Sequence, residues 1–172
     1  GTWGYAAQFH ALIRRAPRFL ELGEAMGQLR IGQSTVELRR AVSWVEERGE
    51  ATFTHVVLSD RALSLADARD PARRSAIGKA GKAVGMELTI SDEDGTIETQ
   101  SWFSKGAEQV SSTQGADWQS EQFTDAVIRG RLVSSGPQEA MGSSWDYDVY
   151  FAAEIASDAG ATDASDANDA GK

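Results

Sequence analysis

The chain has 172 residues, of which 41% are hydrophobic and 25% charged, and this composition is ordinary for a globular protein. Its formal net charge of −9 argues against nucleic acid as a partner, because phosphate binding needs a basic face. The sequence has no cysteine, which excludes disulfides, thiol nucleophiles and thiolate metal sites.

Residues 1–27 are predicted to form a helical segment. Pro17 predicts a kink within it, and Gly27 ends it. The apolar residues that recur there at helical spacing are Phe9, Leu12, Ile13, Ala16, Phe19 and Leu20.

Three strands are predicted next, at residues 29–38, 40–47 and 51–59. The third is rich in β-branched and aromatic residues, and a turn at residues 47–50 joins it to the second as a hairpin.

A central helix is predicted at residues 70–84. Asp70 can accept hydrogen bonds from the first free backbone N–H groups, and Pro71 fits the first turn of a helix. Gly85 supplies the stop at the other end.

Four more strands are predicted after the helix. Those at residues 86–91 and 96–104 flank Asp94-Gly95, a dipeptide typical of a two-residue hairpin turn. Residues 105–117 and 135–144 are predicted as loops and residues 118–123 as a short turn of helix. The last two strands are predicted at residues 125–134 and 145–155, and the second alternates apolar and polar residues.

These elements predict an α+β fold, with an antiparallel sheet of about six strands packed by the N-terminal and central helices. Residues 1–156 are expected to form one domain with the sheet in residues 28–156. Residues 157–172 are predicted to be a disordered acidic tail, because small and polar residues cannot bury enough surface to offset their ordering entropy.

Several side chains are candidates for a site, each with a plainer structural interpretation. His55 is either a pocket base or a hydrogen-bonded core histidine. Arg73 and Arg74 lie on the basic central helix, which is either a docking face for an acidic partner or lipid head groups, or a solvated surface. Trp102 and Trp145 line a groove or belong to the core. Asp146 and Asp148 point to one side of a strand, as a carboxylate pair or as its solvated face.

No nucleophile arrangement, metal-ligand cluster or cofactor loop is apparent, and we expect no catalytic residues, metal or cofactor. A non-enzymatic binding or accessory domain is therefore favoured, with a surface or shallow apolar pocket for a protein or lipid-like partner. The alternatives are a small hydrolase or lyase using His55 with carboxylates, and a subunit of a secretion or phage assembly or an immunity protein. We expect a bacterial, cell-envelope or membrane-tethered protein, with any tether outside residues 1–172.

Overall fold

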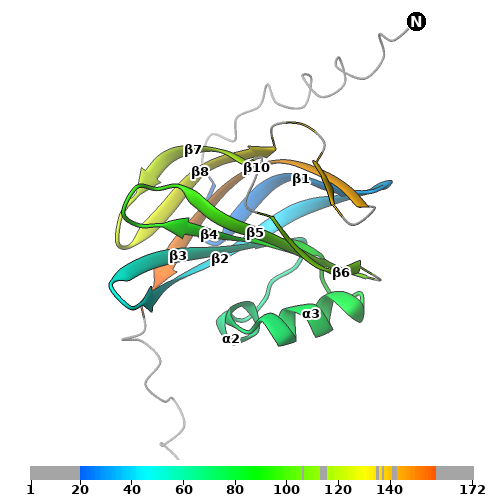
Figure 1. The fold of residues 1–172 in the computed structure, drawn as a ribbon, viewed down its shortest axis with the longest axis horizontal. Coiled ribbons are helices and arrows are strands. Elements are labelled where there is room, and N and C mark those ends of the chain that lie inside the picture. Colours follow the sequence, from blue (N-terminus) through cyan, green and yellow to red (C-terminus); the bar gives the residue numbers. More distant parts are fainter. Residues whose placement is uncertain are drawn as a thin grey trace, which may run out of the picture.

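A computed structural model describes residues 20–105, 107–112, 116–134, 136, 138–140 and 143–157. They form an antiparallel sheet of ten strands with two short helices, so the predicted α+β class is confirmed and the expected count of about six strands is too low (Figure 1). The strands are β1 (Glu24–Ile31), β2 (Ser34–Arg48), β3 (Ala51–Ser59), β4 (Gly85–Ser91), β5 (Ile97–Ser104), β6 (Ala107–Ser112), β7 (Ala116–Phe123), β8 (Val127–Ser134), β9 (Gln138–Ala140) and β10 (Ser143–Ala156), and the helices are α2 (Leu65–Arg69) and α3 (Pro71–Lys79).

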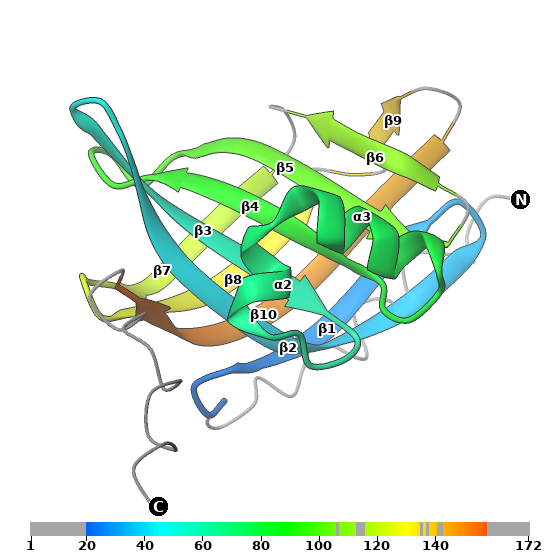
Figure 2. The same ribbon diagram turned by 90° about the horizontal axis from the view of Figure 1, so that it is seen from below.

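The sheet is strongly curled. Its strand order is β6-β5-β4-β3-β2-β1-β10-β8-β7, with β9 paired to the start of β10. All pairings are antiparallel except at the end of β10, where Ile155 and Ala156 pair in parallel with β2. Both helices lie on the outer side of the curl, below β2 to β5 (Figures 1 and 2).

Alternation along β10 separates an inner apolar face from an outer polar face. Tyr147, Val149 and Phe151 are at most 2% exposed and belong to the main core, as the alternating pattern predicts. On the outer face, Asp146 lies 3.0 Å from an Arg30 guanidinium nitrogen, and Asp148 forms two hydrogen bonds with Arg131, at 2.9 and 2.7 Å. The two aspartates therefore act separately in ion pairs, not as a carboxylate pair.

Strand β3 is buried on both sides, because the main core covers its inner face and the helices cover its outer face. All residues from Thr54 to Ser59 are buried. Val56 and Leu58 belong to the main core, whereas Val57 packs in a second, smaller cluster under the helices. The buried members of that second cluster are Trp44, Val57, Ala68, Ala83 and Phe103.

The predicted helix at residues 70–84 is shorter in the structure, and a second helix precedes it. Asp70 caps α3 as expected, because its Oδ1 accepts hydrogen bonds from the backbone N–H groups of Ala72 and Arg73 at 2.8 and 3.2 Å. The helix ends at Lys79, and Gly81 then takes a φ of +66°, so the helix does not reach residue 84.

The two predicted hairpins are present. Strands β2 and β3 are joined at Gly49 and Glu50, and Gly49 has a φ of +68°. Gly95 has a φ of +70° between β4 and β5, but this connection spans residues 92–96 and is longer than the predicted two-residue turn.

Other boundaries differ from the sequence prediction. The predicted strand at residues 29–38 is split by Gly32 (φ +58°) between β1 and β2. Residues 24–27 are strand, so the helical prediction is wrong there, and residues 1–19 lie outside the described part. The predicted tail also lies outside it beyond Ser157.

Three segments predicted as loop or helix contain strands. Residues 118–123 belong to β7 and not to a helix, and the predicted loops at residues 105–117 and 135–144 contain β6 and β9. In β7 the register shifts between Ser120 and Gln122. This bulge interrupts the alternation by which a strand is recognised from sequence.

Candidate functional site

The five predicted site residues lie in three environments. Trp102 and Trp145 meet inside the curled sheet. His55 and Arg74 lie buried between the sheet and the helices, and Arg73 lies on the outer surface of α3.

Trp102 and Trp145 form a close pair in the core. Their ring centroids are 3.9 Å apart with the planes tilted by 41°, and the two residues are 1% and 2% exposed. They come from β5 and β10, which are separated in the sheet by the four strands β4, β3, β2 and β1. The curl of the sheet therefore creates this pair.

A polar pair lies on the same two strands. The Tyr147 hydroxyl donates a hydrogen bond to Gln100 Oε1. Gln100 precedes Trp102 by two residues and Tyr147 follows Trp145 by two, so both belong to the same inward-facing rows. Burial raises the pKa of Tyr147, although the bond to Gln100 opposes this shift. The interior of the sheet therefore contains hydrogen-bonding groups beside aromatic rings.

Two indole N–H groups in this interior have no hydrogen-bond partner among the described residues. They are Nε1 of Trp145 and Nε1 of Trp118, whose ring stacks on Phe151 with centroids 5.2 Å apart. A buried donor without an acceptor costs about 1–3 kcal/mol. Each of these donors is therefore suited to an acceptor atom from a water or a bound molecule.

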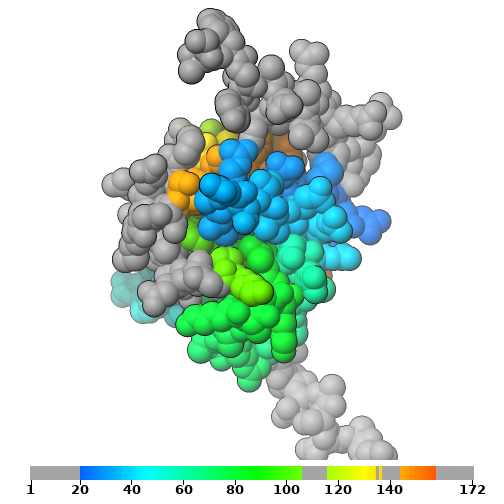
Figure 3. All heavy atoms as spheres, turned by 90° about the vertical axis from the view of Figure 1, so that its right-hand side faces the viewer, coloured from blue at the N-terminus to red at the C-terminus, as the bar shows by residue number. Residues whose placement is uncertain are grey.

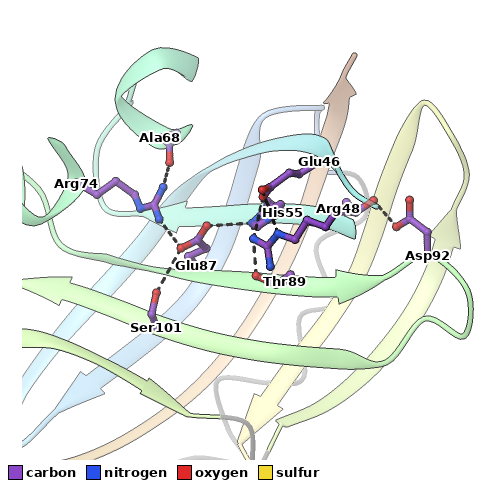
Figure 4. Close-up of polar contacts among 10 residues, drawn as sticks. Glu46, Arg48, His55, Ala68, Arg74, Glu87, Thr89, Asp92 and Ser101 are labelled. Carbon is purple, nitrogen blue, oxygen red and sulfur yellow. Dashed lines mark hydrogen bonds and ion pairs between the residues drawn. The ribbon is translucent and has the colours of Figure 1, made fainter. Parts of the chain in front are cut away.

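The second candidate region is a charged network around His55 (Figure 4). The His55 ring stacks on Trp44, with centroids 4.9 Å apart and an angle of 5°. Its Nδ1 lies 3.1 Å from Glu87 Oε1. Its Nε2 lies 2.7 Å from Glu46 Oε2, without the alignment of a regular hydrogen bond.

Arg74 connects α3 to this network. Its side chain is 1% exposed and donates hydrogen bonds to Glu87 Oε2 and to the backbone carbonyl of Ala68. Burial lowers the pKa of Arg74, and the charge of Glu87 opposes that shift. At the other end, hydrogen bonds from Arg48 at 3.0 and 2.8 Å are the main cause of a lowered pKa of Glu46.

The geometry suits His55 to a structural link more than to proton transfer. The expected contact with a carboxylate is present, but both ring nitrogens lie against carboxylates and the residue is only 4% exposed. A general base needs a nitrogen within reach of the substrate proton. Here both nitrogens join β3 to its neighbours β2 and β4.

Arg73, unlike the buried Arg74, lies at the surface. Its side chain is 59% exposed, and its nitrogens lie 3.6 Å from an Asp67 oxygen and 3.4 Å from an Asp70 oxygen. Asp67 belongs to α2 and Asp70 caps α3, so both acidic partners are close in sequence, and Arg73 has the environment of a solvated helix surface.

Sequence reasoning did not single out Gln100, Tyr147, Trp118, Glu46 or Glu87 as site residues. Tyr147 was identifiable as inward-facing from the alternation in its strand. The glutamates are only recognisable once His55 has been paired with its cross-strand neighbours.

No protein-family model matches the chain, and comparison with curated proteins and with solved structures found no significant match. In the described part of the chain, neither helix has the length and apolar character needed to cross a membrane.

Proposed function

We propose that the chain is a non-enzymatic binding domain, and that the inner side of its curled sheet holds a small amphipathic, lipid-like ligand against Trp102 and Trp145. The observation that carries the proposal is the Trp145 indole N–H, which is buried without an acceptor among the described residues. A ligand that brings an acceptor to this donor removes the cost of leaving it unpaired.

The surrounding residues define the chemistry of the ligand. The two indole rings make the region apolar, while Gln100 and Tyr147, which are hydrogen-bonded to each other, place polar groups two residues away on the same strands. Binding sites of this kind combine an apolar lining with a few placed polar groups. A ligand with an apolar chain and a carboxylate fits, because a charged acceptor makes the stronger hydrogen bond to an N–H donor.

The alternative of a hydrolase or lyase using His55 has less support. The carboxylates on both ring nitrogens and the stacked Trp44 ring leave His55 no evident access to a substrate. A subunit of a larger assembly, or a protein-binding module, is the second alternative, and it requires no interior ligand.

Oleate is a suitable probe, because it has an apolar chain and a single carboxylate. We expect saturable binding to the wild-type protein by isothermal titration calorimetry. Trp145→Phe keeps an aromatic ring but removes the N–H, so it should weaken binding by about 10- to 100-fold, the equivalent of one hydrogen bond to a charged group. The matched control is Trp44→Phe, on the outer side of the sheet against His55, which should leave oleate affinity unchanged.

Two results would count against the proposal. One is the absence of oleate binding to a wild-type protein that also carries no ligand in native mass spectrometry. The other is equal affinity of wild-type and Trp145→Phe proteins, which would mean that an ordered water satisfies the indole. Circular dichroism of each variant establishes that the fold is intact.

A further inference from the structure

The C-terminal end of α3 carries a cluster of cations, which we call the lysine corner: Lys79, Lys82 and Lys105. These are three of the four lysines of the chain, and all three are exposed. A Cβ atom built on Gly81 would lie 3.3 Å from Lys105 Cδ, so the Lys105 side chain lies beside the turn that follows the helix. The end of α3 and the end of β5 therefore contribute to one cluster.

The lysine corner is not neutralised by its surroundings. Among the described residues, none of its three ammonium groups has an ion pair, and residues 71–86 contain no acidic side chain. Asp60 lies at the same end of the sheet, where its Oδ1 accepts a hydrogen bond from the Val84 backbone N–H at 2.8 Å, but this aspartate already has a cation, Arg61, at 3.8 Å. The corner is therefore a positive region on a protein with a net charge of −9.

The lysine corner and the tryptophan pair share one end of the curled sheet. Trp102 precedes Lys105 by three residues on β5, and Trp145 pairs with Ile31 next to the turn between β1 and β2. Figure 3 faces this end of the molecule, with the β1–β2 turn in blue and the α3 residues in green. The turn between β2 and β3, at Gly49, lies at the opposite end of the sheet.

The chemistry of the corner favours an extended anionic surface over a single shaped anion. Lysine presents a point charge on a flexible stem, without the two-pronged geometry by which arginine selects one carboxylate or phosphate. The exposed residues between the lysines are small, since they are Ala80 and Gly81. They leave the ammonium groups free to reach several mobile head groups at once.

We propose that the lysine corner docks the protein on a membrane of anionic phospholipids, with the end of the sheet that holds Trp102 toward the bilayer. The proposal rests on the proposed function in one respect, because the bilayer is then the source of the lipid-like ligand. Charges more than a Debye length away, roughly 8 Å at physiological salt, are largely screened. The net negative charge of the whole molecule therefore does not prevent the contact.

Vesicle co-sedimentation tests the docking with the full chain. We expect binding to phosphatidylcholine vesicles that contain phosphatidylserine as about one third of the lipid, and none to pure phosphatidylcholine. Binding should be lost in about 0.5 M NaCl, where the Debye length is about 4 Å. Lys79→Gln should weaken binding about fivefold, and Lys79→Gln with Lys82→Gln about 30-fold, since each lysine near an anionic surface contributes about a factor of five.

The matched control is Arg48→Gln. It removes one positive charge, as Lys79→Gln does, but from a side chain that is 52% exposed, paired with Glu46 and located at the opposite end of the sheet. It should leave vesicle affinity close to that of the wild type. Circular dichroism establishes that each variant is folded.

The absence of cysteine allows the orientation to be tested as well. An environment-sensitive fluorophore on Ala80→Cys, within the lysine corner, should shift its emission to the blue on phosphatidylserine vesicles. The same label on Glu50→Cys, an exposed residue in the β2–β3 turn, should not respond.

Three results would overturn the proposal: equal binding to neutral and anionic vesicles, wild-type affinity of the double lysine variant, or an equal response of the two labels. Oleate titration separates this proposal from the proposed function, because the lysine variants should bind oleate as the wild type does. A protein that binds oleate but not anionic vesicles refutes the docking alone. A protein that binds anionic vesicles through the lysines but takes up no oleate refutes the interior ligand alone.

Discussion

The ion pair between Arg74 and Glu87 offers the sharpest test of how α3 is held on the sheet. The Arg74 side chain is 1% exposed and that of Glu87 is 13% exposed. Arg74→Met would leave the Glu87 carboxylate buried without its cation. Removing one partner of a buried pair costs about 3–5 kcal/mol in the free energy of unfolding. We expect about 3 kcal/mol, the lower end of that range, because Glu87 keeps its contact with His55.

The neighbouring arginine provides the control for this change. Arg73→Met removes the same side-chain type from the same helix, but Arg73 is 59% exposed and its ion pairs are 3.6 and 3.4 Å long. An exposed pair contributes at most about 1 kcal/mol. Urea unfolding of both variants gives the comparison, and a loss of 3 kcal/mol should also lower Tm by about 6–12 °C.

The outcome that would refute this reasoning is an Arg74→Met variant as stable as Arg73→Met. A double variant, Arg74→Met with Glu87→Gln, separates the two contributions, because no unpaired charge is left in the interior. It should be more stable than Arg74→Met alone. If it is no more stable than Arg74→Met, the cost comes from lost packing of Arg74 and not from the stranded carboxylate.

Three further predictions concern the interior of the sheet. Phe151→Ala should lower the free energy of unfolding by about 3–5 kcal/mol, since the ring is fully buried, and a near-zero cost in urea unfolding would place this face in solvent. Burial raises the pKa of Tyr147, so wild-type stability should fall above pH ~10, where the phenol ionises in the unfolded chain but not in the folded one. Tyr147→Phe should reduce that loss. Equal slopes of Tm against pH for the two proteins above this pH would contradict the prediction. A Cβ atom at Gly130 would lie 2.4 Å from the backbone oxygen of Gln119 and 2.6 Å from Trp118 Cη2. Gly130→Ala should therefore lower the free energy of unfolding by about 1–3 kcal/mol and alter tryptophan fluorescence, whereas an unchanged spectrum would mean that the Trp118 ring lies elsewhere.

Local patterns in the sequence correctly predicted features that depend on residues close together in the chain. The alternation around Val149 identified the buried face of β10, and Asp70 identified the start of α3. Gly32 shows the limit of this reasoning. A glycine inside an apolar run is compatible with a weak strand or with a turn, and the positive φ of +58° decides for the turn.

The site residues depend on contacts that no local pattern contains. Trp102 and Trp145 are brought together only by the curl of the four strands between theirs. Arg73 and Arg74 are adjacent in sequence, but successive residues of a helix point about 100° apart, so one faces solvent and the other the sheet. The sequence identified both arginines but not which of them is buried.

The place of β10 in the middle of the sheet has a consequence for biosynthesis. This strand pairs with β1 on one side and with β8 on the other, although β1 begins at residue 24 and β10 ends at residue 156. During synthesis, β1 therefore leaves the ribosome long before its partner β10 exists. Until β10 is made, the edge of β1 that will pair with it is open to aggregation. Pairings between distant parts of a chain also form slowly, so we expect β10 to join the sheet late in folding.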